Sequence, residues 1–206
     1  MNLLVSDRDR IISHLSKDDI LKNIISSNEF PVLRSSNNLF HDLMSCIIEQ
    51  QIHHRSTKKI YAKVLSNAKL SELTPDNFKI LEKNNFEGAT LSISKFETMQ
   101  SVLNLFKSDV TDWNNLSNDE IHNKLGTIKG VGRKTINLLL IYSLAREDIF
   151  IEDDYHIQKI MINLFDLDNS SRVTAQIKEI TSEWAPYRSY AFLTLLQTKN
   201  RTKNSN

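Results

Sequence analysis

The sequence predicts an all-α protein, and three observations support that prediction. Glycine and proline are scarce, with four and three among 206 residues, whereas all-β folds need many turn residues. Apolar residues recur at helical spacing over residues 39–48. The composition, 40% hydrophobic and 25% charged, is that of an ordinary globular protein. The length suits one domain or two small lobes.

The apolar stripes and the helix start and stop residues predict the elements along the chain. Pro31 ends a first segment, and Gly88 breaks the chain again in its middle. We expect helices at about 7–15, 18–26, 39–48, 56–65, from 74–76 onward, 93–106, 117–125, 133–144, 154–165 and 173–184. The predicted organisation is an N-terminal helical adapter (1–35), a main domain (36–197, with a hairpin at about 120–144) and a flexible tail (198–206).

Cysteine usage and hydropathy limit the classes of protein. Cys46 is the single cysteine, which excludes a disulfide framework, a cysteine-ligated iron–sulfur cluster and a multi-cysteine zinc site. No run of 18 apolar residues occurs, so a membrane-spanning helix is not expected. The N-terminus becomes charged at once and lacks a signal-peptide core. We therefore expect a cytoplasmic protein without a membrane partner, or a nuclear one in a eukaryote.

The charge distribution points to an anion site that the net charge does not reveal. Lys and Arg number 26 against 25 Asp and Glu, a net charge of +1, which gives no global support for a nucleic-acid partner. Residues 51–63 and 121–134, however, each contain four cations and no acidic residue. A solvated face would explain one such run. Two runs, one of them on a glycine cluster, favour a site for phosphate.

That glycine cluster lies in the segment LGTIKGVGRKTINLLLIYSL, residues 125–144. Gly126, Gly130 and Gly132 fall between a short helix and a buried one, and they permit a tight turn with close backbone approach. The second helix would present free N–H groups and its positive dipole end at that turn, which suits a phosphate. A plain packing corner is the alternative, and the flanking Lys129 and Arg133 favour the phosphate site.

With this hairpin, three further segments resemble the helix-hairpin-helix DNA glycosylase superfamily, most closely its 3-methyladenine glycosylase II branch. Asp154, followed three residues later by Ile157, matches the essential aspartate that comes after the hairpin. The segment WAPYRSYA at 184–191 is similar to the branch's W-x-P-[WY]-R-S-Y-A motif. The segment IIEQQI at 47–52 resembles its I-x-x-Q-Q helix end. The four motifs occur in family order over about residues 36–197.

The resemblance implies two helical lobes with a cleft that holds the hairpin and Asp154. It implies a base-excision repair enzyme that flips damaged bases, most plausibly alkylated purines such as 3-methyladenine, out of duplex DNA and hydrolyses their N-glycosidic bonds. The expected partner is damaged duplex DNA, and the expected state is a monomer. Beyond a structural Na+ or K+ on the backbone carbonyls of Gly126, Ile128 and Val131, no cofactor is expected.

The resemblance also assigns roles to side chains. Asp154 would stabilise positive charge at the deoxyribose C1′ or activate a water, although from spacing alone it is equally suited to cap the following helix. Gln51 would enter the minor groove near the wedge position. The other DNA-binding candidates are His53, Lys129, Gly130, Gly132, Arg133 and Thr135. The candidates for the base pocket are Trp113, Tyr155, Trp184 and Tyr187, of which Trp184 and Tyr187 fit a hydrophobic core at least as well.

Lys134 opens the main alternative. The alkylation branch usually carries Trp at this position, whereas a lysine is typical of members that also cleave the sugar–phosphate backbone. Lys134 could therefore be the Schiff-base nucleophile of a bifunctional glycosylase/AP lyase acting on oxidised bases. An alternative of another class is a non-catalytic DNA-binding module that uses the same hairpin. The position of Asp154 argues against this module, because phosphate binding does not need a carboxylate there.

Overall fold

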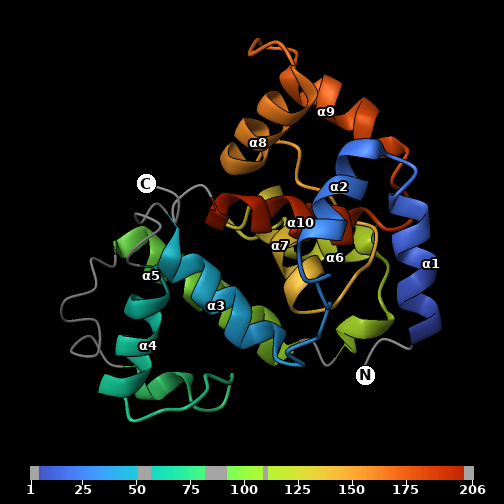
Figure 1. The fold of residues 1–206 in the computed structure, drawn as a ribbon. Coiled ribbons are helices and arrows are strands. Elements are labelled where there is room, and N and C mark those ends of the chain that lie inside the picture. Colours follow the sequence, from blue (N-terminus) through green and yellow to red (C-terminus); the bar gives the residue numbers. More distant parts are fainter. Residues whose placement is uncertain (1–4, 51–56, 82–91, 109–110, 202–206) are drawn as a thin grey trace. The chain divides into compact units, whose positions relative to one another are not determined.

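The computed structural model describes residues 5–50, 57–81, 92–108 and 111–201, and every regular element within those ranges is a helix (Figure 1). The all-α prediction is confirmed. Among the described residues, none of the helices combines the length and apolarity that crossing a bilayer requires.

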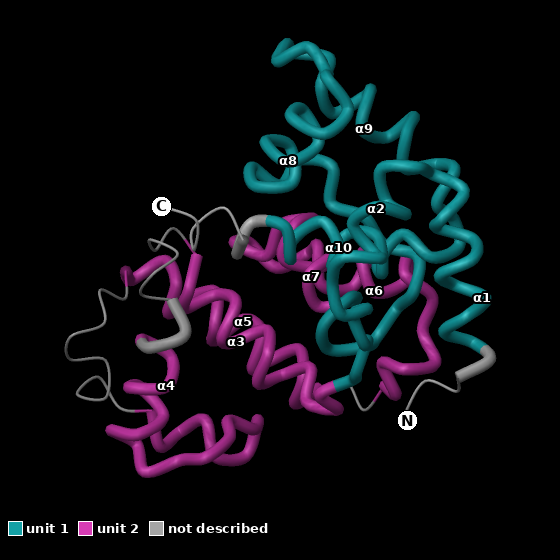
Figure 2. Tube along the Cα trace, viewed as in Figure 1, with its two compact units in different colours: residues 1–35, 140–206 teal, residues 36–139 magenta. Residues whose placement is uncertain are grey.

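The chain forms two compact units, which Figure 2 colours separately. Unit 1 comprises residues 1–35 and 140–206, and unit 2 comprises residues 36–139. Packing therefore joins segments that are distant in sequence within unit 1. The predicted boundaries at residues 35 and 197 divide the chain into consecutive segments, and this division stays a prediction.

Unit 2 is built around α3 (Leu39–Glu49), which packs against α4 (Thr57–Asn67) and α5 (Ile93–Ser108). The predicted stripe is the buried face of α3. The unit continues with the 3-10 helices η1 (Phe78–Ile80) and η3 (Trp113–Asn115), then with α6 (Asn118–Leu125) and the start of α7 (Arg133–Tyr142). Phe106 stacks on Trp113 at a centroid distance of 5.0 Å and meets Phe40 edge-on at 5.3 Å.

Unit 1 contains α1 (Val5–Leu15), α2 (Asp19–Ser27), α8 (Tyr155–Phe165), α9 (Val173–Ser182) and α10 (Arg188–Arg201). Helix α10 packs against both α2 and α8. Trp184, 2% exposed, is part of this core, where its ring meets Phe150 edge-on at 5.6 Å. The Trp184 indole Nε1–H donates to Asp18 Oδ2 at 3.1 Å, which ties the N-terminal segment to the core.

Most predicted helices are confirmed within a few residues, and one predicted start is wrong. Residues 74–76 do not begin an α-helix, although Thr74 and Asn77 form the reciprocal side-chain-to-backbone bonds of a helix start. The Thr74 N–H donates to Asn77 Oδ1 at 2.8 Å, and the Asn77 N–H donates to Thr74 Oγ1 at 3.3 Å. A single 3-10 turn, η1, follows. The predicted break at Gly88 lies outside the described residues.

Candidate functional site

The glycine cluster forms a tight turn between α6 and α7. A capping box of Ser117 and Glu120 starts α6. After α6, the N–H of Ile128 donates to the Leu125 carbonyl at 3.1 Å, and the N–H of Val131 donates to the Ile128 carbonyl at 3.0 Å. The Ile128 and Val131 side chains are buried, while the backbone between and beside them is exposed. The two apolar side chains thus anchor a turn whose outer side faces solvent.

Gly130 and Gly132 of the turn are glycines for different structural reasons. Gly130 has a φ of 94°, which side chains other than hydrogen rarely adopt, and a Cβ there would lie 2.5 Å from Thr98 Oγ1. Gly132 has open space where its Cβ would be, with no heavy atom within 4 Å. Gly130 is therefore required by the fold, whereas Gly132 leaves room for an external ligand.

The structure separates the predicted DNA-binding residues into three groups. Lys129, Gly130, Gly132 and Arg133 are exposed on the turn, as is the catalytic alternative Lys134. Thr135 is 9% exposed, and its hydroxyl accepts a hydrogen bond from Gln50 Nε2 at 3.3 Å. Gln51 and His53 lie outside the described residues.

Asp154 is the N-cap of α8, one of the two roles that its position allowed. Its Oδ1 accepts the N–H of His156 at 2.9 Å and the N–H of Ile157 at 3.1 Å. Capping by a carboxylate satisfies two helix-end donors and places negative charge at the positive end of the helix dipole. This geometry fixes the orientation of the carboxylate, which a catalytic group requires as much as a structural one.

Sequence reasoning missed Tyr142, which belongs to the same unit as Asp154 and is affected by its charge. Partial burial and the Asp154 charge raise the pKa of the Tyr142 hydroxyl above its ordinary value of 10.0. The phenol is therefore a neutral hydrogen-bond donor at physiological pH. An aromatic residue at the end of an otherwise aliphatic helix stripe is the signal that could have identified it.

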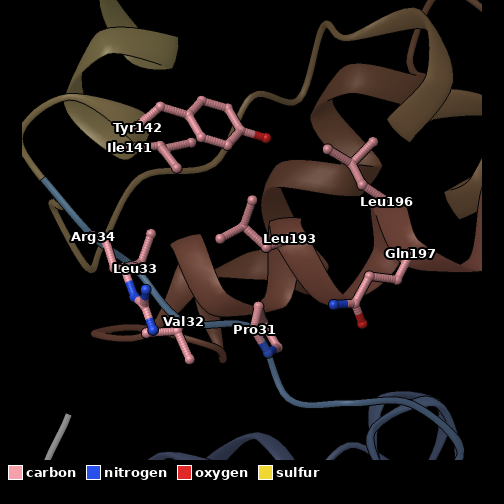
Figure 3. Close-up of a pocket in the computed structure, with 9 residues that line it drawn as sticks. All are labelled: Pro31, Val32, Leu33, Arg34, Ile141, Tyr142, Leu193, Leu196 and Gln197. Atoms are coloured by element: carbon pink, nitrogen blue, oxygen red, sulfur yellow. The ribbon is translucent and has the colours of Figure 1, made fainter. Parts of the chain in front are cut away.

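Tyr142 also lines an open pocket of about 440 Å³ in unit 1 (Figure 3). The other walls come from residues 31–34, from Ile141, and from Leu193, Leu196 and Gln197 of α10. Most of this lining is aliphatic. The Gln197 Oε1 is buried and has no hydrogen-bond partner among the described residues. The pocket therefore presents mostly aliphatic walls together with the Tyr142 ring and the Arg34 side chain.

The four aromatic candidates for a base pocket lie elsewhere. Trp113, Trp184 and Tyr187 are 8%, 2% and 8% exposed and pack against other side chains of their own units. The side chain of Tyr155 is exposed, and the Lys159 ammonium lies 4.5 Å from its ring centroid. The burial of Trp184 and Tyr187 is what the core alternative expects.

The Arg188-Ser189-Tyr190 part of the WAPYRSYA segment holds the loop that leads to Asp154 in place. Arg188 forms a bidentate pair with Asp148, with Nε and Nη2 at 2.6 and 2.9 Å from the carboxylate oxygens. Ser189 Oγ accepts the Ile149 N–H at 2.9 Å and donates to the Arg146 carbonyl at 2.6 Å. The Tyr190 hydroxyl donates to Glu147 Oε1 at 3.0 Å. The hydrogen bonds to the Asp148 carboxylate raise the pKa of Arg188 above its ordinary value.

Comparison with known proteins accords with this arrangement. No family model matches the chain. It is 24% identical over 174 residues to DNA-3-methyladenine glycosylase 1 of Schizosaccharomyces pombe, a match that covers 77% of this chain and 76% of that relative. It is 22% identical over 194 residues to a putative DNA-3-methyladenine glycosylase of Bacillus subtilis, covering 90% and 67% of the two chains.

A solved structure shares the fold. The Schizosaccharomyces pombe 3-methyladenine DNA glycosylase in complex with abasic DNA superposes with a TM-score of 0.80 at 24% identity, over 93% of this chain and 97% of that one. These similarities in sequence and fold support the resemblance to the helix-hairpin-helix DNA glycosylase superfamily. In this chain, α6, the turn at 126–132 and α7 form the helix–hairpin–helix arrangement.

Proposed function

We propose that the protein is a DNA glycosylase that removes alkylated purines such as 3-methyladenine from duplex DNA by hydrolysis. The observation that supports this most is Asp154, a carboxylate whose orientation is fixed by two backbone N–H groups. The relatives named as DNA-3-methyladenine glycosylases support the same substrate class.

The proposed reaction begins with backbone binding. The exposed turn holds a phosphate through its N–H groups, while Lys129 and Arg133 add positive charge, so binding carries no base readout. The target nucleotide then rotates out of the stack. As the N-glycosidic bond breaks, its electron pair leaves with the base and positive charge develops at C1′. The Asp154 carboxylate stabilises that charge, and a water adds to C1′ and loses a proton.

The pocket beside Tyr142 is the proposed site for the flipped base. An alkylated purine carries positive charge, which the face of the Tyr142 ring would attract. The aliphatic walls exclude water from the leaving base. A monomer bound to one duplex, in the compartment that holds the DNA, suffices for this chemistry.

A monovalent cation fits the turn in its donor chemistry. The Gly126, Ile128 and Val131 carbonyls belong to one turn, and neutral carbonyl oxygens are the ligands that K+ and Na+ accept in proteins. The Ile128 carbonyl already accepts the Val131 N–H at 3.0 Å and retains a second lone pair. We propose that these three carbonyls would hold Na+ or K+, whose charge would favour a nearby phosphate.

The test is base release from duplexes that each carry 3-methyladenine, 7-methylguanine, hypoxanthine, uracil or 8-oxoguanine. We expect release of the two alkylated purines, and loss of that release in Asp154→Asn. Binding to a duplex without release from any substrate would contradict the proposal and support the non-catalytic module.

The lyase alternative rests on Lys134, whose exposed side chain begins the first turn of α7. Borohydride trapping on abasic duplex distinguishes the two reactions. We expect no covalent adduct, and base release largely retained in Lys134→Gln. A strong adduct that disappears in Lys134→Gln would establish Schiff-base chemistry and displace the hydrolytic mechanism.

A further inference from the structure

Two successive carbonyls of the hairpin turn are bound by side chains from outside the hairpin. Gln50, the residue that ends α3, donates through Nε2 to the Gly130 carbonyl at 3.0 Å. Thr98, in α5, shares its single hydroxyl proton between the Lys129 carbonyl, at 3.0 Å from Oγ1, and the Ser94 carbonyl of its own helix, at 2.9 Å. Both carbonyls therefore have polar partners on the protein side of the turn.

A third side chain, that of Lys95, holds the backbone at the end of α3, where Gln50 lies. The Lys95 ammonium donates to the backbone carbonyls of Ile48 and Gln50, at 2.8 and 2.6 Å, and so captures the end of α3. Partial burial lowers the pKa of Lys95 below its ordinary value of 10.5. We call Gln50, Lys95 and Thr98 the hairpin clasp. All three belong to unit 2, as do the carbonyls of the turn that Gln50 and Thr98 bind.

The hairpin clasp fixes the direction of the turn's carbonyl and N–H groups, and so determines which side of the turn can bind a phosphate. A peptide plane is rigid and trans, so its N–H points away from its C=O. Because Thr98 holds the Lys129 carbonyl, the N–H of Gly130 in the same plane points to the opposite side. The close approach of Thr98 is the same one that forbids a Cβ at Gly130. An anion is repelled by carbonyl oxygens and attracted by N–H groups, so this orientation is the one that phosphate binding needs.

We propose that Gln50 and Thr98 are positioning residues for phosphate binding, and that they act by holding the Lys129 and Gly130 carbonyls away from the DNA backbone. This inference rests on the proposed function. It assigns to Gln50, part of the Gln-Gln motif, a role inside the protein rather than on the DNA. It also gives Thr135 the role of a second acceptor for the Gln50 amide, at 3.3 Å.

The test uses near-isosteric variants of the full chain. Gln50→Met and Thr98→Val remove the donors and keep the shape, while Thr98→Ser keeps the hydroxyl and should restore binding. Ser101→Ala is the matched control, because Ser101 donates to the Glu97 carbonyl of its own helix at 3.0 Å and not to the hairpin turn. The probes are an undamaged duplex and one carrying a tetrahydrofuran abasic-site analogue.

We expect each donor-removing variant to weaken binding of both duplexes by about 3- to 10-fold, the effect of losing one net hydrogen bond. The slope of log K against log salt should become shallower by up to about one, because one phosphate contact is weakened. The KM for base release should rise while kcat stays within about 2-fold. Unchanged affinity and salt slope, or a fall in kcat alone, would overturn the proposal.

A second measurement does not depend on the DNA. In the free protein, the Val131 amide proton bonds to the Ile128 carbonyl within the turn. Its hydrogen exchange should be faster in Gln50→Met and Thr98→Val than in the wild type or Ser101→Ala. Equal exchange in all variants would refute the clasp. A wild-type chain that fails to bind duplex would instead refute the proposed function and leave the exchange result standing.

Discussion

Exchanging Asp154 for Asn separates catalysis from helix capping. In the wild type, Oδ1 accepts two backbone N–H groups, at 2.9 and 3.1 Å. An Asn can place its own Oδ1 in the same position, and Asn and Asp are about equally good N-caps. The free energy of unfolding should therefore fall by less than about 1 kcal/mol. Base release should fall by about 10²- to 10⁴-fold, because the charge that stabilises C1′ is lost.

Asp18→Asn is the matched control in the same unit. Asp18 caps α2 with the same geometry, its Oδ1 accepting the N–H groups of Ile20 and Leu21 at 2.9 and 3.0 Å. Its Oδ2, however, accepts the Trp184 indole N–H at 3.1 Å. An Asn there can satisfy either the cap or the buried indole, but not both. We expect a cost of about 1–3 kcal/mol in the free energy of unfolding and an unchanged rate of base release by the folded protein.

The assay is single-turnover release of 3-methyladenine together with urea unfolding of each variant. The expected result is an inversion: the more stable variant, Asp154→Asn, is the inactive one. If Asp154→Asn retains full activity while folded, the carboxylate has only its capping role. If Asp154→Asn loses as much stability as Asp18→Asn, the two caps are not equivalent and the reasoning from their geometry fails.

Three further predictions concern the hairpin and the single cysteine. Gly132→Asp should fold normally, since its Cβ would have open space, yet weaken DNA binding at all sequences, as a salt titration would show. Gly130→Ala should lower the free energy of unfolding in urea by at least about 1–2 kcal/mol, the cost of a left-handed backbone. Burial, with the charges of Glu49 and Asp42, raises the pKa of Cys46 from 9.0 to about 12. Iodoacetamide at pH 8 should accordingly alkylate the native thiol about a thousandfold more slowly than the unfolded one.

Features that depend on local sequence were predictable. The stripe at 39–48, the Ser117 cap and the cap at Asp154 each involve residues within a few positions of one another, so pattern and spacing identify them. The wrong helix start at 74–76 is also local in origin. There, Thr74 and Asn77 form the reciprocal bonds of a helix start, but only the 3-10 helix η1 follows.

Contacts between distant segments were not predictable. Gln50 is 80 positions from the Gly130 carbonyl it binds, and no spacing rule joins them. Thr135 carries the signature of a DNA contact because it follows the cationic turn, yet its hydroxyl bonds to Gln50. The pocket walls likewise combine residues 31–34 with α10, so the aromatic residues that the sequence offered as pocket candidates gave no guide to it.

Side chains of the Gln-Gln segment and of the WAPYRSYA segment bond to backbone atoms elsewhere in the chain. Gln50 and Thr98 hold hairpin carbonyls, and Ser189 holds the Arg146 carbonyl and the Ile149 N–H. The buried Ile149 N–H is left unsatisfied if it loses its bond to Ser189, at a cost of about 1–3 kcal/mol. The Gly130 carbonyl is exposed and can bind water instead, so it loses less. An exposed cation such as Lys129 loses only a screened interaction when it is replaced. Substitution should therefore be tolerated better at the charged residues that face the DNA than at the neutral residues that shape the backbone presented to it.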